Sequence, residues 1–138
     1  MRSLGLDIGD RRIGVALSDP EGILASPLAV INRRNERLDI EAITEIILKH
    51  QVGQVVVGLP FSMDGSLGQQ AEKVKDFTQK LAEHTKVPLE YRDERLTTVM
   101  AERLKRAAGG KKKAGNDAQA AAIILQGYLD EKHKPELT

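Results

Sequence analysis

The sequence has 138 residues, of which 41% are hydrophobic and 30% charged, with a formal net charge of +1 and no cysteine. This composition is typical of a soluble globular protein, and the length predicts one domain over residues 1–138. The lack of cysteine excludes disulfides and thiolate zinc sites, and the low net charge excludes a polycation. The short apolar runs predict no secretion signal and no membrane span, so we expect a cytoplasmic protein.

Alternating apolar residues predict three antiparallel strands in the N-terminal third. Leu4, Leu6 and Ile8 alternate in LGLDIG, and RIGVALSD alternates in the same way, so the short polar link GDRR predicts a hairpin. A third strand is expected in ASPLAVIN, with Pro27 at its start or on a sheet edge. Asp7 interrupts the first apolar run, although strands disfavour Asp and a buried carboxylate without a partner is costly.

Helices and strands then alternate. Asn35 is expected to cap a helix over ERLDIEAITEIILKH, and QVVVGLP reads as a strand covered on both faces. Ser66 and Gln69 have capping-box spacing, which predicts a second helix starting near Leu67. The expected inner faces of these helices are, first, Leu38, Ile43, Ile46 and Ile47, and second, Leu67, Ala71, Val74, Phe77 or Thr78, and Leu81.

The C-terminal part begins with a strand, LEYR, followed by a helix over about residues 98–108. Residues 103–114 carry six Lys or Arg and no acid, a block that either attracts a polyanion or is a solvated loop. Asn116 or Asp117 is expected to cap a last helix with Ala118, Ala121, Ala122, Leu125 and Leu129 inside. The order βββαβαβαα predicts an α/β fold with a mixed five-stranded sheet and helices on both faces.

Three acidic positions that are distant in sequence meet if the first strand is central. Asp7 lies on that strand, Asp93 and Glu94 follow the last strand, and Asp117 opens the last helix. If the first and last strands are parallel, their carboxyl ends share one sheet edge, where open α/β sheets bind ligands. Converging carboxylates repel unless a cation lies among them, and Mg²⁺ or Mn²⁺ prefers such oxygens. Two such ions would activate a water for phosphodiester cleavage.

Each acid also has an ordinary structural explanation. Asp7 could begin the hairpin turn, and Glu94 could pair on the surface with Arg92 or Arg95. Asp117 could serve only as a carboxylate at the positive end of the helix dipole. Spacing alone supports these alternatives at least as well as a shared site.

Four segments, GLDIGDRRIGVALSD, VVGLPFSMDGSLG, DERLTT and DAQAAAIILQGYLD, together resemble the YqgF family of RuvC-like, RNase H-fold proteins in their order and spacing. The resemblance covers essentially the whole chain. It implies an RNase H-like sheet of strand order 3-2-1-4-5 and a nuclease that processes the 5′ end of pre-16S ribosomal RNA. An earlier view of the family implies a Holliday junction resolvase acting on branched DNA instead. A non-catalytic RNA-binding assembly factor is a second alternative.

The resemblance also implies the site residues. Asp7, Glu94 and Asp117 match the family's acids, which implies that they are catalytic and hold Mg²⁺ or Mn²⁺. Asp93 is a reserve ligand, since adjacent strand residues face opposite ways. The segment before the last helix reads GNDAQ where relatives often read Val-Asp-Lys, so a basic residue is missing near the substrate.

The remaining motif residues have simple physical roles. Gly9 and Gly14 would permit a close backbone approach or a positive φ. Arg12 would bind a phosphate or lie in a turn, and Arg95 would contact the nucleic acid backbone or a neighbouring carboxylate. The lysines of the basic block are expected to hold phosphates without reading sequence: Lys111, Lys112 and Lys113. The ribosome or pre-ribosome is a further implied partner, and the sequence does not indicate an oligomeric state.

The opening segment also resembles the phosphate-binding hairpin of the actin, sugar-kinase and Hsp70 group. Those proteins close two lobes over ATP. A chain of 138 residues has room for one lobe, so this interpretation would require a partner half.

Overall fold

The computed structural model describes residues 1–60, 68–94 and 115–133. It contains five strands and three helices, listed here in chain order: β1 (Arg2–Ile8), β2 (Arg12–Ser18), β3 (Ala25–Asn32), α1 (Glu36–Lys49), β4 (Val52–Leu59), α2 (Gln69–Ala82), β5 (Leu89–Asp93) and α4 (Gly115–Lys132). The helix expected over about residues 98–108 and the basic block up to residue 114 lie outside the described residues.

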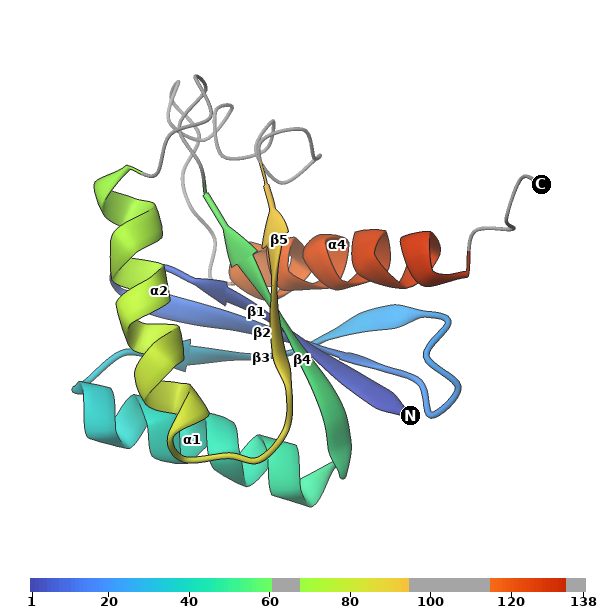
Figure 1. Ribbon diagram of the computed structural model, residues 1–138, viewed down its shortest axis with the longest axis horizontal. Helices are drawn as coiled ribbons and strands as arrows, with labels where there is room; N and C mark the ends of the chain where they lie inside the picture. Colours follow the sequence, from blue (N-terminus) through green and yellow to red (C-terminus); the bar gives the residue numbers. More distant parts are fainter. Residues whose placement is uncertain (61–67, 95–114, 134–138) are drawn as a thin grey trace.

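The strands form one mixed sheet in the order β3-β2-β1-β4-β5 (Figure 1). β1 pairs antiparallel with β2 and parallel with β4, and β5 extends the parallel half. The predicted strand order 3-2-1-4-5 is therefore confirmed. Because β1 is central, the carboxyl ends of β1, β4 and β5 share one edge of the sheet, which is where open α/β sheets bind ligands.

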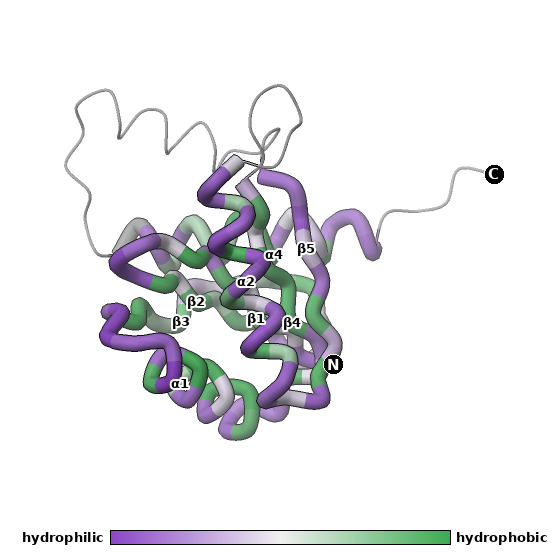
Figure 2. The backbone as a smooth tube through the Cα atoms, turned by 60° about the vertical axis from the view of Figure 1, so that its left-hand side comes forward, coloured by the Kyte–Doolittle hydropathy of each residue, from purple (hydrophilic) through white to green (hydrophobic). Residues whose placement is uncertain are grey.

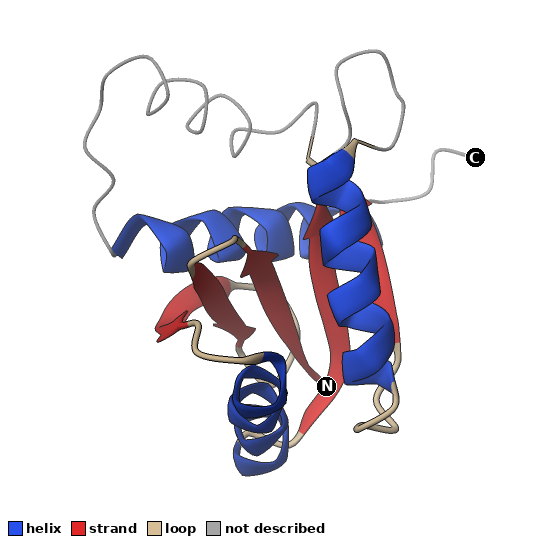
Figure 3. Ribbon diagram, turned by 90° about the vertical axis from the view of Figure 1, so that its left-hand side faces the viewer, coloured by secondary structure: helices blue, strands red, loops and turns tan. Residues whose placement is uncertain are grey.

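Helices cover both faces of the sheet (Figure 3). α1 and α2 pack on one face over a large core, which includes Leu4, Leu6, Val55, Val57 and Ile43. α4 crosses the other face over a smaller core built on Ala16 and Val56. In Figure 2, β4 is mostly hydrophobic, whereas α1 alternates hydrophobic and hydrophilic residues. A strand covered on both faces and an amphipathic helix have these patterns.

No described helix has the length and apolar content needed to cross a bilayer.

The helix starts agree only in part with the sequence. The Asn35 side chain caps α1 by accepting a hydrogen bond from Leu38 N at 2.9 Å, as predicted. The predicted capping box of α2 is wrong: the helix begins at Gln69 with Gly68 as N-cap, a residue that serves there nearly as well as Ser. The predicted cap of α4 is also wrong, because Asp117 lies within the first turn, where a carboxylate still suits the helix dipole.

The buried helix faces also deviate slightly from the predicted ones. α2 buries the expected residues from Ala71 to Leu81. α1 buries Asp39 and Ile40 in addition to Ile43 and Ile47, and α4 also buries Ala120 and Ile124. The residues expected inside that are only partly buried are Leu38, Ile46 and Ala122.

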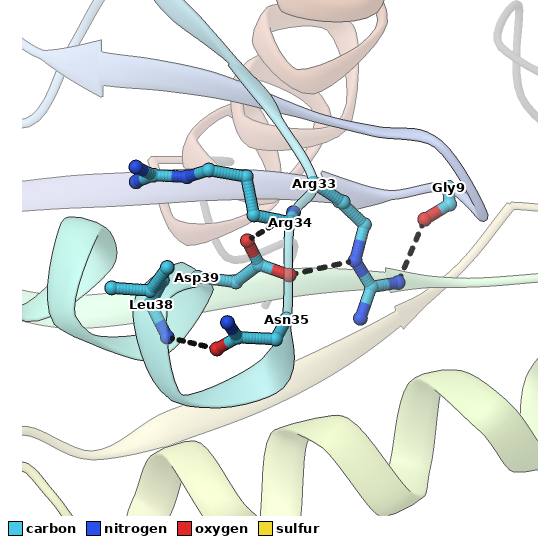
Figure 4. A network of polar contacts seen from close by, with 6 residues as sticks. All are labelled: Gly9, Arg33, Arg34, Asn35, Leu38 and Asp39. Atoms are coloured by element: carbon cyan, nitrogen blue, oxygen red, sulfur yellow. Dashed lines mark hydrogen bonds and ion pairs between the residues drawn. The ribbon is translucent and has the colours of Figure 1, made fainter.

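The burial of Asp39 has a clear cause in a polar network at the start of α1 (Figure 4). Arg33 Nε lies 3.2 Å from Asp39 Oδ2, and Arg33 Nη1 donates to Gly9 O at 2.9 Å. Asp39 Oδ1 accepts from Arg34 N at 3.1 Å, and the Arg33 guanidinium lies 4.9 Å from the centre of the Phe77 ring. One guanidinium thus ties the β1–β2 hairpin to both α1 and α2, which holds the carboxyl end of β1 in place.

Candidate active site

Asp7 is a strand residue on the face that α4 covers. It lies inside β1, opposite Gly14 of β2, and is 5% exposed, so it is not part of the hairpin turn. A Cβ on Gly5, two residues earlier, would lie 2.8 Å from Leu125 Cβ of α4. Residues i and i+2 of a strand share a face, so Asp7 also faces α4.

The first turn of α4 packs against Gly14 of β2. A Cβ on Gly14 would overlap the backbone carbonyl of Asp117, so the first turn of the helix lies directly on this glycine. Cross-strand partners share a face, so Asp117 is brought beside Asp7. The expectation that Gly14 permits a close backbone approach is confirmed.

The third acid, Glu94, lies against Gly58 of β4, on the opposite side of Asp7 from Gly14. Leu6 is opposite Val57 in the β1–β4 ladder, so the next position along both strands sets Gly58 beside Asp7. A Cβ on Gly58 would overlap Glu94 Oε1, which means that the carboxylate of Glu94 occupies the space left by this glycine. Gly58 was not among the predicted site residues, although a glycine within a buried strand rich in β-branched residues is a signal of close approach.

Gly14, Asp7 and Gly58 form a row across three neighbouring strands, which we call the glycine row. Neighbouring strands lie about 4.8 Å apart. Asp117 lies against Gly14 and Glu94 against Gly58, so both acids are close to Asp7, which lies between the two glycines. Glu94, Asp117 and Asp7 are 1%, 3% and 5% exposed. Three carboxylates from β1, from the end of β5 and from α4 thus share one buried neighbourhood.

Asp117 is engaged by an arginine in this arrangement. Arg12 Nε lies 2.9 Å from Asp117 Oδ2, and the two side chains are 25% and 4% exposed. Across the described parts of the chain, no three His, Cys, Asp or Glu side chains are grouped closely enough to hold a metal ion as they stand. Carboxylate oxygens are the ligands that a divalent cation prefers, so the donor chemistry fits such an ion, although the described side chains do not form a complete ligand set as they lie.

Glu94 is a buried residue rather than one of a surface ion pair. Its backbone N donates to Leu59 O at 3.2 Å, which holds the chain against β4 just beyond β5. Of its two expected surface partners, Arg92 instead places Nη1 2.8 Å from Glu131 Oε2 of α4, and Arg95 lies outside the described residues. Burial, reinforced by the negative charge of Asp93, raises the pKa of Glu94 to about 7. Burial therefore favours the protonated form of Glu94 in the protein without a cation.

Of the residues expected to contact nucleic acid, the structure describes Arg12. Arg12 lies at the rim of the acidic site with a quarter of its side chain exposed. The other expected contacts lie outside the described residues: Arg95, Lys111, Lys112 and Lys113.

Gly14→Ala is expected to lower the free energy of unfolding by about 2 kcal/mol. Overpacking against a backbone carbonyl costs roughly 1–3 kcal/mol or more, which exceeds the roughly 0.5–1 kcal/mol gained by replacing a strand glycine. Urea denaturation measures the change. Gly53→Ala in β4 is the matched control, because its Cβ would meet only the Met1 side chain, which can move aside. Equal stability of both variants and the parent would contradict the close seating of α4 on Gly14.

The sequence matches known proteins over nearly its full length. A family model described as "RuvX: Holliday junction resolvase" matches residues 1–131. A protein of Caldanaerobacter subterraneus subsp. tengcongensis named "Putative pre-16S rRNA nuclease" is 48% identical over 136 residues, covering 96% of this chain and 98% of that protein. A protein of the same name from Clostridium botulinum strain Hall is 47% identical over 137 residues, covering 97% and 100%.

Solved structures share the fold at much lower identity. T. thermophilus RuvC in complex with a Holliday junction substrate superposes with a TM-score of 0.60 at 17% identity, covering 97% of each chain. The fowlpox virus Holliday junction resolvase gives a TM-score of 0.54 at 11% identity, covering 95% of this chain and 99% of that one. The sheet with α4 across one face is therefore a RuvC-like, RNase H-type fold.

Proposed function

The chain belongs to the RuvX family, and from this premise we propose that it is a nuclease that hydrolyses phosphodiester bonds in the 5′ precursor segment of 16S ribosomal RNA. The substrate class follows the name shared by relatives at 47–48% identity. The observation that carries the proposal is the glycine row, which lets Glu94 and Asp117 approach Asp7 from opposite sides. Ribosome assembly in the cytoplasm, with the pre-ribosome as partner, is part of the same proposal.

The three acids are proposed to hold Mg²⁺ or Mn²⁺ and to be the catalytic residues. These ions prefer carboxylate oxygens, and buried carboxylates without a cation repel one another. When bound, such an ion supplies Lewis-acid chemistry, in which water is activated and charge on the leaving oxygen is stabilised. No nucleophile from the protein is required.

The protein residues contribute position and charge. Asp7 is held on the central strand, so its carboxylate is the fixed member of the set. Glu94 gives up the proton that burial favours when a cation arrives, because a ligand carboxylate must be ionised. Asp117 is carried by the first turn of α4, whose backbone rests on Gly14. Asp93 remains a proposed reserve ligand.

The basic block is proposed to hold the substrate backbone together with Arg12 and Arg95. Replacing Lys111, Lys112 and Lys113 by Ala is expected to weaken single-stranded RNA binding and to reduce the slope of log affinity against log salt by about 2, since each lost phosphate contact contributes about 0.7. Fluorescence anisotropy at several salt concentrations measures the slope. A variant with Lys49, Lys75 and Lys86 changed to Ala removes the same charge elsewhere; an equal loss of slope in both variants would contradict a specific role for the block.

A second candidate function is Holliday junction resolution. The family description and the RuvC-like fold favour it, although structures below 20% identity establish the fold alone. A resolvase must cut two strands symmetrically, so it is expected to act as a dimer. Nuclease and resolvase share the same acidic site and differ in substrate and assembly.

One cleavage experiment separates these functions. The purified protein is incubated with RNA carrying the 5′ precursor end of 16S rRNA, and separately with a four-way DNA junction, in Mg²⁺, Mn²⁺ or EDTA. We expect cation-dependent cleavage of the RNA. Symmetric cutting of the junction by a dimer seen in light scattering would favour the resolvase, and RNA binding without cleavage in any cation would favour a non-catalytic assembly factor.

A further inference from the structure

The ion pair between Arg12 and Asp117 lies inside the acidic site rather than beside it. Arg12 Nε is 2.9 Å from Asp117 Oδ2, and Asp117 is 3% exposed. The same carboxylate is brought next to Asp7 by the seating of its backbone on Gly14. A guanidinium and a divalent cation would therefore draw on the same carboxylate.

Hydrogen bonds and packing contacts hold the backbone of both residues of this ion pair. Arg12 is the first residue of β2, and its carbonyl accepts from Gly9 N at 2.9 Å across the hairpin turn. The neighbouring Arg11 carbonyl accepts from Arg33 N at 2.9 Å. The backbone of Asp117 lies against Gly14. Since contacts hold both backbones, a change of partner at Asp117 is expected to come from rotation of the two side chains.

We propose that Arg12 is a built-in competitor of the cation: its guanidinium holds the Asp117 carboxylate in the metal-free protein and releases it when the cation binds. This inference rests on the proposed metal-dependent function. Asp117 Oδ2 lies 2.9 Å from the guanidinium, so a cation between the acids that draws on this oxygen competes with the arginine for it. Breaking the pair is possible only as an exchange: water can solvate the arginine, which is a quarter exposed, while the cation compensates the Asp117 carboxylate, which is 4% exposed.

The released arginine gains a second role at the rim of the site. Once Asp117 has turned toward Asp7, the Arg12 guanidinium is available to a phosphate of the substrate, for which its planar fork is well suited. Arg12 is thus a positioning residue in the metal-free protein and a substrate contact in the loaded one. This exchange links cation loading to nucleic acid binding.

Mn²⁺ titration by calorimetry tests the competition without measuring catalysis. Arg12→Gln is expected to bind Mn²⁺ about tenfold more tightly than the parent, within the usual range of coupling between two ligands. Arg12→Lys keeps the charge but loses the fork, so it is expected to bind a fewfold more tightly; it also serves if the glutamine variant fails to fold. Arg37→Gln removes the same charge from an exposed pair with Glu41 and should leave Mn²⁺ affinity unchanged.

Denaturation in EDTA and in saturating Mn²⁺ gives an independent readout. Arg12→Gln is expected to be less stable than the parent in EDTA, because the ion pair between Arg12 and Asp117 is lost. A tenfold affinity gain must reduce that deficit by about 1.4 kcal/mol in saturating Mn²⁺. A purely structural role of Arg12 would leave the deficit equal in both conditions.

The outcomes separate the two proposals. Equal Mn²⁺ affinity in the parent and both Arg12 variants, or weaker binding by the variants, overturns the competition while leaving the metal site intact. Absence of Mn²⁺ binding by all of these proteins overturns the proposed metal dependence and the competition with it.

Discussion

Asp7→Asn is expected to reduce phosphodiester cleavage at least about a thousandfold while leaving the protein folded. The amide has nearly the shape of the carboxylate, so the packing under α4 is preserved. It lacks the negative charge that holds a divalent cation, whose contribution to the transition state is several kcal/mol, and each 1.4 kcal/mol corresponds to about a factor of ten in rate. Single-turnover cleavage of the precursor RNA in Mg²⁺ and Mn²⁺ measures the loss.

The fold itself is expected to tolerate this change well. Asp7 is 5% exposed among other acids, so removing its charge relieves repulsion, and the unfolding free energy should stay equal or rise. RNA binding in EDTA should be unchanged. Asp10→Asn is the matched control, since Asp10 lies in the adjacent turn with its side chain 64% exposed. Cleavage by Asp7→Asn at the parental rate would refute the acidic site.

Glu94→Gln is expected to abolish cleavage and, in metal-free buffer, to stabilise the protein at alkaline pH. Burial and the charge of Asp93 raise the pKa of Glu94 from 4.5 to about 7, so the folded state holds a proton that the unfolded state has already lost. Each pKa unit corresponds to about 1.4 kcal/mol, so ionised Glu94 costs the fold up to about 3 kcal/mol. Glutamine avoids this cost because it does not ionise.

The sign of the pH dependence follows from proton linkage. Between the two pKa values the folded state binds more protons than the unfolded state, so stability falls as pH rises through this window. The stability difference between Glu94→Gln and the parent should be near zero below a pH of about 4.5, grow up to about pH 7, and level off above it. Urea denaturation at a series of pH values measures the difference.

A saturating divalent cation should remove most of this difference, because the cation offsets the charge of ionised Glu94 in the parent. Glu90→Gln in β5 is the control, since Glu90 is an exposed residue of the same strand. A pH-independent difference, or a variant that is less stable at every pH, would show that Glu94 is not a buried acid with a raised pKa.

Local patterns in the sequence were sufficient for most of the described elements, whereas the strand order in the sheet came from the family resemblance. Alternation predicted the three N-terminal strands, with β3 over Ala25–Asn32 as expected, and Asn35 marked the start of α1. These features depend on residues that are close in the chain, where side-chain periodicity and capping chemistry act directly. The predicted start of α2 was wrong by about two residues, because the N-cap is Gly68, which has no side chain to mark the position.

The sequence predicted the candidate acids of the site but not their surroundings. The chain pattern marked Asp7, Glu94 and Asp117 as candidates, but it left open a turn residue, a surface ion pair and a helix-start carboxylate. Folding brings the three acids into one neighbourhood, because Gly14 and Gly58 are next to Asp7 only after β2 and β4 pair with β1. The pairing of Asp117 with Arg12 was likewise beyond the sequence.

What the sequence determined by itself was therefore the set of strands and helices and the identity of the acids. The tertiary structure decided which acids are buried, which share a neighbourhood and which arginine pairs with Asp117. The physical reason is that burial and ion pairing depend on contacts between residues more than a hundred positions apart, such as Arg12 and Asp117. No local periodicity encodes such a contact, and the packing of α4 on the sheet creates it.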